Sequence, residues 1–133
     1  MYDETSLRAA PLTEAVEQSR RLVARTMRAW NLTSGEEPVT AIVAELVANA
    51  VTHAATPFEL RLLRSDSHQI RVEVRDRDHR LPILRNPHPL SDGGRGMFLV
   101  DCYAASWGAE PAPDGGKVVW AEIDVAPHTA VRT

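Results

Sequence analysis

Two long amphipathic segments dominate the pattern of apolar and polar positions in the first half of the chain. The first runs from about Thr13 to Trp30 and predicts a helix with Thr13 as its N-cap. Its expected core-facing stripe is Val16, Ser19, Val23, Met27 and Trp30. A second helix is predicted from about Pro38 to Ala54, with Pro38 in its first turn. Its stripe is Val39, Ile42, Val43, Leu46, Val47, Ala50 and Val51. Each helix therefore has one face to bury.

Short segments of alternating character follow the second helix. Strands are predicted at about residues 58–62, 70–75, 104–109 and 117–125, with a loop at 81–96 and a short helix at 97–103. The order helix, helix, strand, strand, loop, helix, strand, strand predicts a two-layer α+β sandwich. Its sheet is expected to be antiparallel or mixed and covered by helices on one face. A Rossmann fold would need a regular alternation of strand and helix.

Length and charge narrow the class of protein. The 133 residues fit one domain, expected at 1–125 with a loose tail at 126–133. A net charge of −3 gives no reason to expect nucleic acid or a membrane as partner. The acidic N-terminus lacks the pattern of a secretory signal, so we expect a cytoplasmic protein. The only cysteine, Cys102, is expected to be a small core residue, and no histidine spacing suggests a zinc site.

Three polar residues recur at steps of four in the second predicted helix: Glu45, Asn49 and His53. Successive members turn through only about 40°, so they share one flank beside the apolar stripe. A carboxylate and an amide oxygen one turn apart suit a hydrated Mg²⁺ ion. The alternative is the solvated edge of an amphipathic helix.

Asp76 stands where the alternation of the second strand would place an apolar residue. It has the same parity as Ile70, Val72 and Val74, so its carboxylate is expected on the core-facing side. A buried carboxylate needs a hydrogen-bond donor, which the amino group of a ligand such as adenine would supply. Alternatively, the strand ends at Arg75 and Asp76 begins a turn.

A glycine-rich segment, Gly93 to Gly96, precedes the short helix predicted from Met97. Glycines before a helix N-terminus offer backbone N–H groups to a phosphate. The segment matches neither of the common nucleotide-binding glycine patterns, and many helices simply start after a glycine turn.

Taken in order, these segments resemble the GHKL ATPase superfamily and, within it, the anti-sigma-factor serine/threonine kinases. The stretch Glu45 to Ala54 resembles the N-box in its ELxxNAxxHA form. Val74-Arg75-Asp76 is similar to the start of the box that binds adenine, and Gly94 to Val100 is similar to the GRGLxLV segment. Gly116 to Trp120 resembles the closing GKTVW strand. The resemblance extends over about residues 13–125 and implies the Bergerat α/β sandwich.

The resemblance also implies roles for individual residues. Asn49 would bind Mg²⁺, Asp76 the adenine, and the backbone of Gly94 and Gly96 the phosphates of ATP or ADP. Glu45 would be the general base on an attacking hydroxyl. The implied nucleotide-binding set also includes His53, Arg95 and Met97.

Two departures from the family pattern bear on the function. Asp78-His79-Arg80 stands where many relatives have the glycines of a DxGxG pattern, and Val118 replaces a common threonine whose hydroxyl could touch the nucleotide. The leading hypothesis is a kinase that phosphorylates an anti-sigma-factor antagonist and binds a sigma factor, with a homodimer as a candidate assembly. The runner-up is a binding module that does not transfer phosphate, with or without ATP. A histidine-kinase catalytic domain is less favoured, because no dimerisation helix with a phosphoacceptor histidine precedes the predicted domain.

Overall fold

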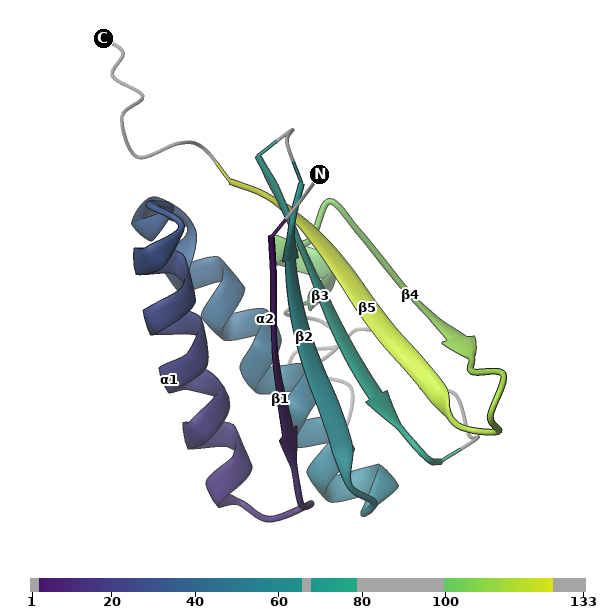
Figure 1. Ribbon diagram of the computed structural model, residues 1–133. Coiled ribbons are helices and arrows are strands. Elements are labelled where there is room, and N and C mark those ends of the chain that lie inside the picture. Colours follow the sequence, from purple (N-terminus) through teal and green to yellow (C-terminus); the bar gives the residue numbers. More distant parts are fainter. Residues whose placement is uncertain (1–2, 66–67, 79–99, 126–133) are drawn as a thin grey trace, which may run out of the picture.

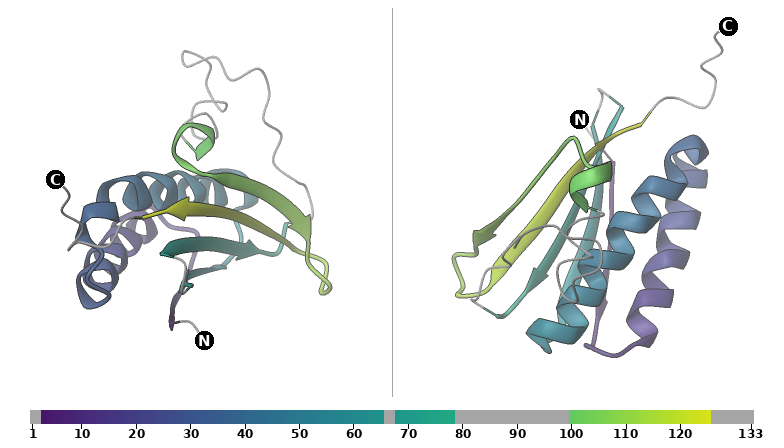
Figure 2. Two further views of the ribbon diagram at one scale, coloured as in Figure 1. Left: turned by 90° about the horizontal axis from the view of Figure 1, so that it is seen from above. Right: turned by 180° about the vertical axis from the view of Figure 1, so that it is seen from behind.

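The structure, a computed structural model, describes residues 3–65, 68–78 and 100–125. Five strands form one open sheet in the order β1-β2-β3-β5-β4, and each neighbouring pair is antiparallel. The helices α1 and α2 lie side by side on one face of this sheet (Figures 1 and 2). The elements are β1 (Asp3–Ala9), α1 (Glu14–Ala29), η1 (Thr33–Gly35), α2 (Glu36–Asn49), η2 (Ala50–Ala54), β2 (Phe58–Arg64), β3 (Gln69–Asp76), β4 (Ser106–Pro111) and β5 (Lys117–Asp124). The α+β class and the one-sided helical layer are confirmed.

Helix α1 ends in a hydrogen-bonded arrangement that its sequence encodes. Asn31 adopts the left-handed conformation at φ 59°, which asparagine tolerates better than most residues. Its N–H donates to the carbonyl of Arg28, and the N–H of Leu32 donates to the carbonyl of Met27 at 2.8 Å. This is the pairing of a Schellman motif. At the other end, Thr13 occupies the N-cap position as predicted, although its hydroxyl makes no capping bond.

The core lies between the helices and the inward positions of the strands. From α1 it takes Ser19, Val23 and Met27 of the predicted stripe, which are all buried. Val16 and Trp30 pack against the core while staying partly exposed, and the fully buried side of α1 is completed by Ala15, Leu22 and Thr26. In β3 the residues alternate strictly between buried and half-buried positions. The predicted periods of both element types are therefore confirmed.

Strand β1 was not predicted from the sequence. Leu7 is its only large apolar residue, so the alternation is weak. The strand pairs with β2 along its whole length, and ion pairs also cross the two strands: the Arg8 guanidinium lies 3.7 Å from Glu59, and Arg61 lies 2.8 Å from Glu4. Cross-strand ion pairs of this kind stabilise a register that side-chain apolarity alone would leave open.

The structure corrects two further predictions for the second half of the chain. Cys102 is exposed rather than part of the core. β4 begins at Ser106, two residues later than predicted, and it continues to Pro111. Within the described residues, no helix is both long enough and apolar enough to span a membrane.

Candidate functional site

Asp76 is the last residue of β3, and its side chain is buried. The strand alternation places it on the same face as Val72 and Val74, and it is 5% exposed. The expectation that this carboxylate faces inward is confirmed, and the alternative that the strand ends at Arg75 is wrong. A buried carboxylate must be hydrogen-bonded, because leaving it unpaired would cost several kcal/mol.

Lys117 supplies the partner that the sequence reasoning assigned to a ligand. Its ammonium donates a hydrogen bond to Oδ1 of Asp76 at 3.0 Å, and both side chains are buried, at 9% and 2% exposed. The same ammonium donates to the backbone carbonyl of Asp78 at 3.3 Å. The backbone N–H of Asp78 in turn donates to Oδ1 of Asp76 at 2.9 Å. The three residues thus form one closed polar cluster at the junction of β3 and β5.

The parity of Lys117 could have revealed that its ammonium is buried, although not which acceptor it meets. In β5 it alternates in step with Val119, Ala121 and Ile123, all of which are buried. A lysine at the inward position of a strand needs an acceptor, because a buried ammonium is as costly as a buried carboxylate. The register then places it directly opposite Asp76.

The second helix carries the polar triad toward the same end of the sheet. Glu45 and Asn49 lie on a partly exposed flank of α2. After Asn49 the winding changes to a π-helix, η2, and His53 within it is exposed. The predicted helix therefore ends at Ala54 as expected, but its last residues, Ala50–Ala54, form a π-helix instead of continuing the α-helix. Such π segments are rare and often occur at functional sites.

A hydrogen bond joins the segment that follows η2 to the residue that follows β3. The backbone N–H of Arg77 donates to Oγ1 of Thr56 at 3.1 Å. Both α2 and η2 contact β3. Asp76 therefore lies where the helix that carries Asn49 ends against the sheet.

The oxygen-bearing side chains on α2 suit a Mg²⁺ ion shared with a nucleotide better than they suit a metal ion bound only by protein side chains. The described residues contain no group of three or more His, Cys, Asp or Glu side chains that could hold a metal ion. Mg²⁺ commonly takes only one or two protein oxygens and completes its shell with water and phosphate. The amide oxygen of Asn49 is one such oxygen, and the Glu45 carboxylate lies one turn away as a candidate base, so the residues present fit the expected metal as part of a metal–nucleotide complex.

The remaining residues of the expected nucleotide site are not all described. Gly94, Arg95, Gly96 and Met97 lie outside the described residues, as does the whole of the predicted loop at 81–96. Residues 100–103 are helical, which agrees with the second half of the predicted short helix. Val100 is fully buried in the core.

The two departures from the family pattern have different positions. Asp78 takes part in the Asp76–Lys117 cluster through its backbone N–H and carbonyl groups. Val118 pairs with Arg75 in the sheet register, so it lies on the face opposite Asp76. The hydroxyl of a threonine at position 118 would therefore point away from the Asp76 carboxylate.

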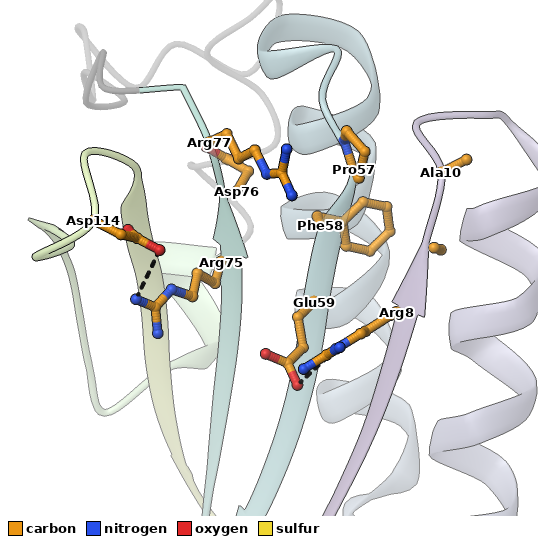
Figure 3. Close-up of a pocket in the computed structure, with 10 residues that line it drawn as sticks. Arg8, Ala10, Pro57, Phe58, Glu59, Arg75, Asp76, Arg77 and Asp114 are labelled. Atoms are coloured by element: carbon orange, nitrogen blue, oxygen red, sulfur yellow. Dashed lines mark ion pairs between the residues drawn. The ribbon is translucent and has the colours of Figure 1, made fainter.

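A polar groove of about 680 Å³ lies at the same end of the sheet and was not foreseen (Figure 3). Its walls carry two ion pairs, Arg8 with Glu59 at 3.7 Å and Arg75 with Asp114 at 3.3 Å. Phe58 and Asp76 also line it. The groove therefore lies on the face of the sheet that carries Glu59 and Arg75, with Asp76 at its border.

Comparison with known proteins identifies what the chain is similar to. Residues 9–122 match the family model described as histidine kinase-like ATPase domain. An uncharacterized protein of Streptomyces coelicolor, SCO4941, is 34% identical over 93 residues, which cover 67% of this chain and 89% of that protein. The crystal structure of the RsbU and RsbW domains of Rv1364c from Mycobacterium tuberculosis superposes with a TM-score of 0.66 at 13% sequence identity. That match covers 98% of this chain, which spans only about a third (34%) of the crystallised one.

Proposed function

The chain belongs to the histidine kinase-like ATPase domain family, and on that premise we propose that it binds ATP with Mg²⁺ as an anti-sigma regulatory protein. In this proposal it is a serine/threonine kinase that transfers the γ-phosphoryl group of ATP to an anti-sigma-factor antagonist. Its other partner is a sigma factor. The assignment to this class rests on the motif from Glu45 to Ala54, since the likeness to the Mycobacterium tuberculosis structure concerns the fold.

The observation that carries the proposal is the buried carboxylate of Asp76 at the end of β3. Oδ1 is engaged by Lys117 and by the backbone of Asp78. Oδ2 is then the oxygen that would accept a hydrogen bond from the amino group of adenine. Hydrogen bonds to an ionised group are worth about 1.5–3 kcal/mol, enough to orient a base.

The residues of α2 would act at the other end of the nucleotide. The amide oxygen of Asn49 would coordinate the Mg²⁺ ion, which offsets the charge of the phosphates when it is bound. Glu45 lies one helical turn, about 6 Å along the axis, from Asn49. It is therefore positioned to accept the proton of a hydroxyl group that approaches the metal-bound phosphate. Backbone N–H groups of Gly94 and Gly96 complete the proposed phosphate site.

The proposal is tested by measuring phosphoryl transfer by variants with substitutions in α2. Purified protein is incubated with labelled ATP, Mg²⁺ and candidate antagonist proteins encoded nearby. Glu45→Gln keeps the side-chain shape, so nucleotide affinity and thermal stability should change little while transfer falls roughly 10²- to 10⁴-fold. Glu37→Gln is the matched control, because Glu37 is an exposed carboxylate in the first turn of the same helix.

The outcomes separate the two function classes. Transfer by the wild type and by Glu37→Gln, but not by Glu45→Gln, supports the kinase. A wild type that binds a partner tightly yet transfers nothing supports the non-catalytic binding module. Transfer by Glu45→Gln at the wild-type rate would remove Glu45 as the base and leave the kinase assignment standing.

A further inference from the structure

The polar groove lies on the face of the sheet opposite α1 and α2. Arg8, Glu59 and Arg75 stand directly opposite one another on β1, β2 and β3. Residues in such a row share one face of a sheet, and here it is the face turned away from the helices (Figure 3). The carboxylate of Asp76 points to the other face, where Lys117 holds it. The groove is therefore distinct from the candidate nucleotide site.

The groove carries more guanidinium groups than carboxylates. Arg8, Arg75 and Arg77 line it together with two outward carboxylates, Glu59 and Asp114. Each carboxylate already has an arginine, at 3.7 Å for Glu59 and at 3.3 Å for Asp114. Within the described part of the chain, no carboxylate forms an ion pair with Arg77, which is exposed (Figure 3). One positive charge in the groove is thus left without compensation.

The two ion pairs in the groove are open to replacement by another anion. Arg8 is 84% exposed, and its 3.7 Å separation from Glu59 is longer than a hydrogen bond. Arg75 and Asp114 are 42% and 68% exposed. Exposed pairs of this kind contribute little to stability, because water screens both charges. A guanidinium also has five N–H donors, so each arginine can accept a further carboxylate.

The shape of the groove suits a chain better than a single small anion. Its arginines come from β1 and from the end of β3, with β2 between them. Neighbouring strands lie about 4.8 Å apart, so these cations extend over roughly 10 Å, the length of about three extended residues. Between them lie two exposed residues without charge, Ala10 and Pro57. The groove therefore offers spaced cations beside a small apolar surface.

We propose that this groove binds an extended acidic peptide segment of another protein, with carboxylates on the arginines and a small apolar side chain on Ala10 and Pro57. Other parts of this chain are poor occupants, because residues 79–99 hold three arginines and one aspartate and residues 126–133 hold no acid. A net charge of −3 and two carboxylates in the groove disfavour a nucleic acid. The inference goes beyond the proposed function, since neither ATP nor phosphoryl transfer enters it.

The experiment measures binding of a fluorescein-labelled hexapeptide of alternating Glu and Val to the full chain by anisotropy. The matched probe is the same peptide with Gln in place of Glu. The Glu peptide should bind more tightly, the difference should shrink as salt is added, and ADP with Mg²⁺ should not change it.

Substitution of the arginines locates the site. Arg77→Gln should weaken binding of the Glu peptide by about 2- to 5-fold, the effect of one exposed charge pair. Combined with Arg8→Gln and Arg75→Gln, the loss should reach about 10- to 100-fold. If the triple variant does not fold, Arg77→Gln decides alone, because it breaks no ion pair among the described residues.

The matched control removes three charges from the other side of the molecule. Arg20, Arg25 and Arg28 are exposed on α1, and their triple Gln variant has the same net charge as the groove variant. It should keep the wild-type affinity for the Glu peptide. An equal loss in both triple variants would mean that only net charge matters, and this would overturn the proposal.

Three further results would overturn it. One is equal binding of the Glu and Gln peptides by the wild type. Another is tighter binding of a thymidine hexanucleotide than of the Glu peptide, which would make the groove a nucleic-acid site. The third is a wild type that sediments as a dimer and a groove variant that is monomeric, which would make this face an interface between copies of the chain. A wild type that binds the Glu peptide through the groove but does not bind ATP overturns the proposed function and supports this inference.

Discussion

Gly116 packs directly against the backbone of Asp76. A Cβ atom at position 116 would overlap the carbonyl oxygen of Asp76 and would lie 3.0 Å from the Cα of Arg77. The obstacle is backbone rather than a flexible side chain, so either the start of β5 or the end of β3 would have to move. Gly116 and Lys117 thus hold Asp76 from two sides, by close packing and by an ion pair.

Replacing Gly116 by Ala is therefore expected to damage stability and binding together. Overpacking of this kind costs about 1–3 kcal/mol, and displacement of Asp76 should weaken ADP binding as well. Urea unfolding and calorimetry measure the two effects. Gly115→Ala is the control: position 115 has φ +99° but no atom near its added Cβ. It should lower stability through backbone strain and leave ADP affinity unchanged. Equal ADP affinity in Gly116→Ala and the wild type would contradict this account of the contact.

Asp76→Asn should reduce ADP affinity by about 10- to 150-fold, because the base loses a hydrogen bond to a charged acceptor. It should also destabilise the fold by about 3 kcal/mol, since the Lys117 ammonium stays buried without its counter-charge. The double variant Asp76→Asn with Lys117→Met removes that unpaired charge. It should regain stability without regaining affinity. Undiminished ADP binding by Asp76→Asn would exclude Asp76 from the nucleotide site.

Asn49→Ala should weaken Mg²⁺–ATP binding more than binding of ATP in the presence of a chelator. The proposed contact of Asn49 is to the metal, which prefers hard oxygen ligands. Thr52→Ala is a suitable control, because Thr52 is exposed in η2 on the same chain segment. Calorimetry with and without Mg²⁺ gives the comparison. Equal losses under both conditions would assign Asn49 to the nucleotide or to the helix rather than to the metal.

Ala55→Gly should stabilise the protein by about 0.5–1 kcal/mol. Ala55 ends η2 in the left-handed conformation at φ 54°, which costs an alanine about 1–2 kcal/mol. Glycine removes this cost but adds freedom to the unfolded chain, so only part of the gain remains. Asn31→Gly should have a smaller effect, because asparagine already tolerates its φ of 59°. Thermal unfolding that shows a loss of stability in Ala55→Gly would contradict the strain at this position.

Asp114 should titrate below its ordinary pKa of 3.8. The backbone N–H of Gly116 lowers the pKa of this carboxyl most, and the Arg75 guanidinium lowers it further. A depressed pKa in the folded state means that the contribution to stability is complete above the unfolded pKa and is lost as the pH falls through the folded one. An NMR titration of the Asp114 carboxyl carbon checks the direction. Arg75→Gln should return the pKa only part of the way, and a full return would assign the whole shift to the ion pair.

Local patterns were enough to predict most of the elements. The helix expected at 13–30 is α1, Glu14–Ala29, because helical periodicity is visible within a few turns. The same reasoning found β2, β3 and β5 from their period of two. It missed β1, whose single large apolar side chain, Leu7, makes no periodic signal. That strand forms because its charges and backbone pair with β2, a partner about fifty residues later in the chain.

Asp76 shows both what the sequence by itself determined and what only the tertiary structure decided. Its parity in β3 was sufficient to predict that the carboxylate is buried, because alternation is a property of consecutive residues. Its partner was not predictable in the same way. Lys117 lies 41 residues further along the chain, and the two meet only because β5 inserts between β3 and β4 in the sheet. Strand order and register depend on how the whole core packs, so the chemistry at Oδ1 of Asp76 is a property of the fold.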